Sequence, residues 1–131
     1  MSFEELRAGN LGVRVARSEE EVRAAQALRF RVFFGEMGAT PDDAALESGL
    51  DADAFDAVAD HLLVLDHDRG EGPESVVGTY RLIRRAAAAR LGRFYSDDEF
   101  DLAPVLAFPG EILELGRSCT DAAYRTRGTL Q

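Results

Sequence analysis

The stretch EILELGRSC, residues 111–119, constrains the fold more than any other, because it has the apolar pattern of a buried strand but carries Glu114, Gly116 and Arg117. In a regular strand the side chains alternate between faces, so Glu114 and Arg117 would point to opposite sides of the sheet. One of them would then face the apolar core, where an unpaired charge is costly. A β-bulge at Leu115 or Gly116 would return both charges to one face, and glycine tolerates the positive φ that some bulges need. The alternative is a plain buried ion pair in a strand without a bulge.

The remaining apolar patterns predict an α/β fold with a mixed, mostly antiparallel sheet and a long first helix. LGVRVA, residues 11–16, alternates as a strand does, and Ser18 followed by Glu21 is a capping box that begins a helix. This amphipathic helix ends near Gly38. After it we expect a mobile acidic loop (residues 40–53), two strands that form a hairpin (61–66 and 75–85) and a helical turn or loop (86–90). A short helix (94–102) and the bulged last strand (111–119) complete the order.

The size and the charge of the chain exclude several classes of protein. With 131 residues, 46% of them apolar, the chain is long enough for one domain over residues 1–131. Its apolar runs are far shorter than the roughly 20 residues of a spanning helix, so we expect a cytoplasmic protein, at most peripheral to the inner membrane face. A net charge of −9 argues against nucleic-acid binding. Cys119 and the two histidines lack ligand spacing, which predicts no metal site and a buried, inert thiol.

Charges of opposite sign are separated along the chain. Seven acids and no basic residue lie between residues 42 and 60, whereas five arginines follow without an acid among them (Arg81, Arg84, Arg85, Arg90 and Arg93). Arg81 falls in the middle of a predicted strand, where a guanidinium needs a carboxylate, and Glu114 is the natural partner if the two strands are neighbours. Arg29 and Phe33 lie one helical turn apart on one side of the first helix. The alternative places Arg29 on the surface and Phe33 in the core.

Five stretches form a pattern that covers nearly the whole chain: LRFRVFFGEMGA, DADAFD with DHLLV, VVGTYRLIR, GRFYSDDEFDL and ILELGRSCTDAAYRTRGTLQ. Together they resemble the N-terminal half of a GNAT-type acyltransferase. Within that superfamily the similarity is to two groups that use acyl carrier protein: the ornithine-acyl carrier protein N-acyltransferases of ornithine-lipid synthesis, and the acyl-homoserine lactone synthases. FYSDDEFDL, LELGRSC and YRTRGT favour the ornithine group, and the chain lacks the tryptophan that lactone synthases usually carry after the first helix.

The resemblance implies a reaction and a set of site residues. The α-amine of ornithine attacks the thioester of a 3-hydroxyacyl carrier protein and gives lyso-ornithine lipid, with no cofactor besides the phosphopantetheine of the carrier. Seven residues match the pattern shared with the lactone synthases. The resemblance implies Glu114 as the catalytic base and six residues that bind the substrate: Arg29, Phe33, Asp53, Asp56, Arg81 and Arg117. Arg81 and Arg117 would hold Glu114 or bind the substrate carboxylate, and the two aspartates would favour a cationic amino acid. The bulged strand would present backbone N–H groups to the thioester carbonyl.

Two groups of residues are the predicted contacts with the carrier protein and its phosphopantetheine. Arg84 and Arg85, together with Arg90 and Arg93, would meet the acidic carrier, with ordinary surface charge as the alternative. The second group, Arg125, Arg127 and Gly128, resembles the loop that holds the pantetheine phosphate, although Leu130 stands where many GNAT enzymes have glycine or alanine.

The sequence stops at Gln131, before the helix and strand that follow this loop in the GNAT family. We therefore treat residues 1–131 as an incomplete domain and expect little or no acyl transfer from them alone. Two other hypotheses remain open. One is a lactone synthase that acts on S-adenosylmethionine, and the other is a non-catalytic module that binds carrier protein through its arginines.

Overall fold

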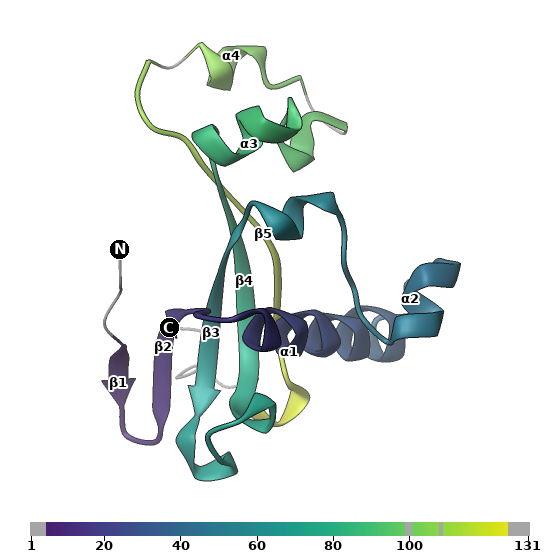
Figure 1. Cartoon of the computed structure of the whole chain (residues 1–131), viewed down its shortest axis with the longest axis vertical. Coiled ribbons are helices and arrows are strands. Elements are labelled where there is room, and N and C mark those ends of the chain that lie inside the picture. Colours follow the sequence, from purple (N-terminus) through teal and green to yellow (C-terminus); the bar gives the residue numbers. More distant parts are fainter. Residues whose placement is uncertain (1–4, 99–100, 108, 126–131) are drawn as a thin grey trace.

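A five-stranded antiparallel sheet forms the centre of the computed structural model, which describes residues 5–98, 101–107 and 109–125 (Figure 1). The strands follow chain order across the sheet: β1 (Leu6–Ala8), β2 (Leu11–Val15), β3 (Asp60–Asp66), β4 (Val76–Arg84) and β5 (Leu113–Thr120). The predicted α/β class and the predicted β3–β4 hairpin are confirmed. β1 was missed because its three residues are all exposed and so carry no apolar alternation.

One long helical segment packs against the sheet, and it changes its winding halfway. α1 (Glu19–Phe30) begins at Ser18, whose side chain accepts a hydrogen bond from the N–H of Glu21. The chain continues without a break into a π-helical segment, η1 (Arg31–Glu36). The buried apolar residues of this segment are Ala25 and Leu28 on α1 and Val32 on η1. They form the main core with four residues of the sheet, Leu63, Leu65, Val76 and Cys119. The predicted first helix is therefore correct in extent, but its last part is wound as a π-helix.

The segment after this helix is more ordered than predicted. Residues 40–53, predicted as a loop, contain α2 (Asp43–Ser48). The side chain of Asp42 caps the start of α2 by accepting the N–H of Ala45 at 2.8 Å, and Gly49 ends it with a φ of +71°. This short helix has no clear apolar period in the sequence, since only Ala45 among its residues is buried.

Short helices surround a second, smaller core at one end of the sheet. They are η2 (Ala54–Ala57), α3 (Arg85–Leu91), η5 (Tyr95–Asp98) and α4 (Ala103–Leu106), while η3 (His67–Arg69), η4 (Pro73–Ser75) and η6 (Ala122–Tyr124) lie in turns. Phe55, Ile83, Ala87, Ala88 and Phe94 form this core. Figure 1 shows α3 and α4 beyond the ends of β4 and β5. Among the described helices, none has both the length and the apolar character needed to cross a membrane.

The last strand carries the predicted bulge, but at a different residue. Thr79 of β4 pairs with Cys119, and Arg81 pairs with Gly116, so two steps on β4 match three steps on β5. The extra residue lies at Arg117 and Ser118, not at Leu115 or Gly116. Arg117 has a φ of +49°, whereas Gly116 is not among the glycines with positive φ. The prediction failed in this detail because it assigned the positive φ to the glycine.

Candidate active site

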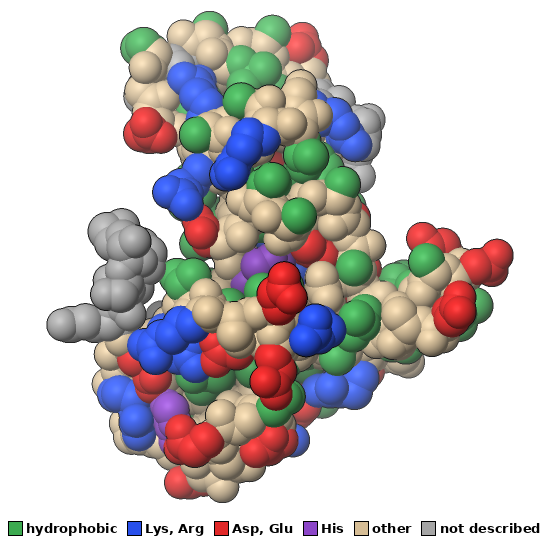
Figure 2. Space-filling model, viewed as in Figure 1, with side chains coloured by type: hydrophobic (Ala, Val, Ile, Leu, Met, Phe, Trp, Pro, Cys, Tyr) green, Lys and Arg blue, Asp and Glu red, His purple; other side chains and the backbone are tan. Residues whose placement is uncertain are grey.

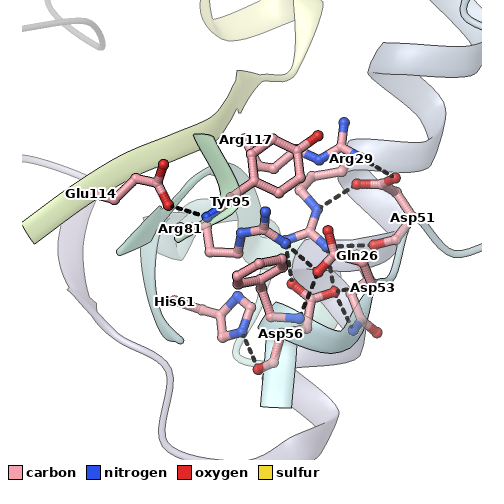
Figure 3. Close-up of polar contacts among 11 residues, drawn as sticks. Gln26, Arg29, Asp51, Asp53, Asp56, His61, Arg81, Tyr95, Glu114 and Arg117 are labelled. Carbon is pink, nitrogen blue, oxygen red and sulfur yellow. Dashed lines mark hydrogen bonds and ion pairs between the residues drawn. The ribbon is translucent and has the colours of Figure 1, made fainter. Parts of the chain in front are cut away.

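Three arginines and three aspartates meet beside the bulge and form a charge network, defined as Arg29, Asp51, Asp53, Asp56, Arg81 and Arg117 (Figure 3). Arg29 binds Asp51 through Nε at 2.9 Å and Asp56 through Nη2 at 2.7 Å. Arg81 uses one nitrogen, Nη1, for Asp53 at 2.6 Å and for Asp56 at 3.1 Å. Arg117 Nη2 reaches Asp51 at 3.2 Å. The formal charges of the six groups therefore cancel.

Four separate elements bring these side chains together. Arg29 lies on α1, Arg81 on β4 and Arg117 at the bulge of β5. Asp53 and Asp56 close a capping box on η2, in which Asp53 accepts the N–H of Phe55 at 2.9 Å and Asp56 accepts the N–H of Asp53 at 3.1 Å. Hydrogen bonds within this turn thus hold both carboxylates in place, in addition to their ion pairs with the arginines.

Burial and pairing act in opposite directions on the charges of the network. Burial alone would raise the pKa of Asp56, but the hydrogen bond and the charge of Arg29, with smaller help from Arg81, hold this pKa below its ordinary value. Burial would lower the pKa of Arg81, whereas Asp53 and Asp56 raise it above its ordinary value. Both groups are consequently charged near neutral pH. Arg29, at 1% exposure, is not on the surface as the alternative had it.

Glu114 does not meet Arg81 or Arg117, contrary to the prediction. Its two oxygens accept hydrogen bonds from the backbone N–H of Tyr95 at 2.9 Å and of Ser96 at 2.8 Å, and the Ser96 hydroxyl donates to it as well. Arg81 instead forms ion pairs with Asp53 and Asp56 at η2. The prediction missed this pairing because strand register alone says nothing of a helix packed over the strand.

Aromatic rings pack against the guanidinium groups of Arg81 and Arg117. The Tyr95 ring centroid is 5.0 Å from the guanidinium carbon of Arg81 and 5.8 Å from that of Arg117. Phe33 lies 5.3 Å from Arg117 and also packs against the main core, so its predicted site and core positions are both found. Phe55 meets Tyr95 edge to face, with ring centroids 5.6 Å apart. These contacts combine cation–π attraction with exclusion of water.

Three residues of the site had no predicted role. Asp51 stood among the seven acids without a feature that set it apart, and Tyr95 lay within the stretch predicted as a short helix, residues 94–102. His61 is buried, and its Nε2 lies 3.0 Å from the carbonyl oxygen of Asp56, which requires the ring to donate from that nitrogen. No spacing in the sequence marks this histidine, because its partner is a backbone atom.

Several buried nitrogens of the site lack a hydrogen-bond partner among the described residues: Arg29 Nη1, His61 Nδ1, Arg81 Nε and Arg117 Nε. Two hollows lie beside the site. One, of about 550 Å³, is lined by Glu19, Gln26, Asp53 and His61 among others. The other, of about 460 Å³, lies along the bulge and is lined by Val32, Met37, Tyr80, Ser118, Cys119, Thr120 and Arg125. The first hollow therefore borders the charge network at Asp53 and Asp56, and the second borders the bulge at Ser118.

The arginines predicted to contact the carrier protein differ in their exposure and in their partners. Arg84 is exposed and pairs with Asp60 at 2.9 Å, whereas Arg85 donates to the carbonyl oxygens of Gly110 at 2.9 Å and Leu106 at 3.2 Å. Arg125 donates to Thr120 O at 2.9 Å and to Glu36 at 3.0 Å. Arg127 and Gly128 lie outside the described residues. Figure 2 shows basic side chains over the part of the molecule around α3 and acidic ones over the projecting α2.

Comparison with known proteins assigns the family. The model of the acetyltransferase (GNAT) domain matches residues 28–131. Curated proteins named L-ornithine N(alpha)-acyltransferase are similar to the chain: that of Agrobacterium fabrum is 47% identical, that of Rhizobium meliloti 48% and that of Brucella abortus 46%. Each alignment covers 95% of the chain but only 44%, 43% and 46% of the respective relative, so the chain spans less than half of their length. No solved structure matches it. The fold, the bulged strand and the matched domain show that the chain belongs to the GNAT acetyltransferase domain family.

Proposed function

We propose that the protein containing this chain is an ornithine N(α)-acyltransferase, which moves a 3-hydroxyacyl chain from acyl carrier protein to the α-amine of ornithine and gives lyso-ornithine lipid. The observation that carries the proposal is the bulge on β5, where an arginine of the charge network and the hollow of about 460 Å³ adjoin the same strand. The names of the relatives support the acceptor and the type of reaction.

Arg117 is the proposed contact for the carboxylate of the acceptor. It pairs with a single carboxylate, that of Asp51, its side chain is 29% exposed, and its Nε has no partner among the described residues. Arg81 is a weaker candidate because it is fully buried and already bridges two aspartates. A guanidinium presents several donors in one plane, which suits a carboxylate.

The thioester lies, in this proposal, along the bulged strand. A bulge leaves a residue unpaired in the ladder, so its backbone N–H is available to a developing oxyanion. The hollow along the bulge has apolar walls from Val32, Met37 and Cys119, which suit a pantetheine arm and the start of an acyl chain. The chemistry needs no further cofactor, because the carrier thioester is itself activated.

The acceptor amine must lose a proton before it attacks. The resemblance implies Glu114 as the base, but both of its oxygens accept hydrogen bonds from Tyr95 and Ser96. Asp53 and Asp56 were predicted to favour a cationic acceptor. Both are paired with arginines, but they also line the hollow of about 550 Å³ together with Glu19 and Arg23. Three carboxylates against one guanidinium support binding of a cationic side chain there.

Acyl carrier protein as the donor and a cytoplasmic location belong to the same proposal. Arg84, Arg90 and Arg93 are exposed and fit an acidic partner, although Arg84 also pairs with Asp60 and Arg93 lies over the ring of Phe55. Arg85 is less exposed and donates to the backbone of Leu106 and Gly110. A variant of these arginines also tests the alternative of a non-catalytic binding module. If Arg84→Ala weakens carrier binding while acyl transfer is never observed, the module hypothesis is favoured.

The test is an acceptor assay with the intact protein that contains this chain. A 3-hydroxyacyl carrier protein is offered with ornithine, with S-adenosylmethionine or with no acceptor, and products are identified by mass spectrometry. We expect N-acylornithine and no lactone, because the relatives are ornithine enzymes. Formation of an acyl-homoserine lactone, or no product with ornithine, would contradict the proposal.

A further inference from the structure

We propose that Glu114 is a positioning residue that holds Tyr95 over Arg81 and Arg117, rather than the group that takes the proton from the acceptor amine. The inference rests on the proposed function only for its kinetic consequences. Its structural part concerns the connection between β5 and η5, and can be measured without turnover.

The first step of the argument is the hydrogen bonding of Glu114. One oxygen accepts the N–H of Tyr95 at 2.9 Å, and the other accepts the N–H of Ser96 at 2.8 Å and the Ser96 hydroxyl. These N–H groups open η5, where the first amides of a helical turn have no partner within the helix. A carboxylate at that place satisfies them and is favoured by the local dipole. Three of the roughly four acceptor positions of the carboxylate are thus taken by η5, and each of these hydrogen bonds favours the ionised carboxylate over the protonated acid that a base becomes.

The second step is what Glu114 holds in place. Tyr95 contacts two arginines of the charge network and the ring of Phe55, at 5.0 Å from Arg81, 5.8 Å from Arg117 and 5.6 Å from Phe55. Figure 3 shows the tyrosine ring between Glu114 and the guanidinium groups. Among the described residues, Glu114 makes no ion pair with either arginine, whereas Tyr95, which it holds, packs against both. Without this carboxylate, the ring would lose its backbone anchor and Arg117 one of its two aromatic walls.

A tryptophan probe tests the structural part. The chain contains no tryptophan, so Tyr95→Trp gives a single reporter at the position in question. In this background Glu114→Gln removes the acceptor for at least one amide, and we expect a red-shifted emission and at least twofold greater quenching by acrylamide. Glu111→Gln, on an exposed glutamate of the same segment, is the matched control and should change neither. Ser96→Ala, which keeps both backbone bonds, should change them less. Equal emission and quenching with and without Glu114 would overturn the inference.

Kinetics in the intact protein test the functional part. For a positioning role, Glu114→Gln raises the KM for ornithine at least tenfold, and the acidic limb of the pH profile of kcat/KM keeps its midpoint. If Glu114 is the base, the substitution instead lowers kcat and abolishes that limb, which would overturn the inference. Should the intact protein fail to acylate ornithine at all, the proposed function fails, while the fluorescence result still decides the position of Tyr95.

Discussion

Asp56 lies at the centre of the charge network, where its two oxygens bind different arginines and a backbone amide. A buried carboxylate in this position is stable only while its partners stay charged. Asp56 also accepts a hydrogen bond from Gln26 at 3.1 Å, so it connects α1, η2 and β4. The network therefore serves the fold as well as the site.

We predict that Asp56→Asn lowers the free energy of unfolding by about 3–5 kcal/mol, because it removes one charge partner from each of Arg29 and Arg81 and leaves the buried network with an uncompensated positive charge. Urea denaturation followed by circular dichroism measures this loss. Asp43→Asn, on an exposed residue of α2, is the control and should change stability by less than about 0.5 kcal/mol. A loss as small as that of the control would show that the ion pairs of Asp56 contribute little.

The pKa of Asp56 predicts the pH dependence of the same effect. Because the pKa is lower in the folded state than its ordinary value of 3.8, the contribution of Asp56 is fully present above that value. It is lost as the pH falls through the folded-state pKa. The difference in stability between wild type and Asp56→Asn should thus be constant from pH 6 to 7 and shrink below about pH 4. A constant difference down to pH 3 would contradict the assigned pairing.

Cys119 is buried, as predicted, and burial raises the pKa of its thiol to about 11. Since the thiolate is the reactive form, the folded protein should react with iodoacetamide at pH 8 at least ten times more slowly than the protein in urea. Mass spectrometry of the alkylated cysteine gives both rates. Equal rates would show that this part of β5 opens readily.

At the scale of elements, the bulge of β5 puts a non-glycine residue in the left-handed region. Arg117 has a φ of +49°, which costs a residue with a Cβ about 1 kcal/mol more than glycine. Arg117→Gly should accordingly be more stable than Arg117→Ala by about 1 kcal/mol, since both lose the ion pair with Asp51. The same two substitutions at Ser118, which lacks a positive φ, should rank in the opposite order. If alanine is better at both positions, the bulge is not where the structure places it.

The sequence predicted most elements because each has a local signal. The N-cap at Ser18, the alternation of β2 and the apolar run of β3 are patterns within a few residues. The second half of the predicted capping box is not formed, because the Glu21 side chain accepts the N–H of Arg17 instead of that of Ser18. The predicted site residues Arg29, Asp53, Asp56, Arg81 and Arg117 lie together in one ion-pair network, while their binding roles stay predictions. What failed were the pairings within the site, because the partner of Arg81 depends on how η2 packs over β4 and on no local pattern.

At the scale of the whole molecule, β5 is the last strand of the described sheet and has one neighbour there. Leu113 and Leu115 on it are 51% and 64% exposed. An exposed edge with apolar side chains favours pairing with another chain. We predict that the 131-residue chain self-associates as its concentration rises, and that Leu115→Glu weakens this. Sedimentation velocity measures it, and a single monomeric boundary at all concentrations would contradict the prediction.

The central claim is that the charge network beside the bulge recognises the acceptor as an amino acid, through Arg117. The most direct test compares acylation of ornithine with that of 1,4-diaminobutane, which lacks the carboxylate, by the intact wild-type protein and its Arg117→Gln variant. Loss of a charge-assisted contact predicts a fall in kcat/KM for ornithine of roughly 100-fold, about 3 kcal/mol, and little change for the diamine. An equal fall for both acceptors, or none for ornithine, would contradict the claim.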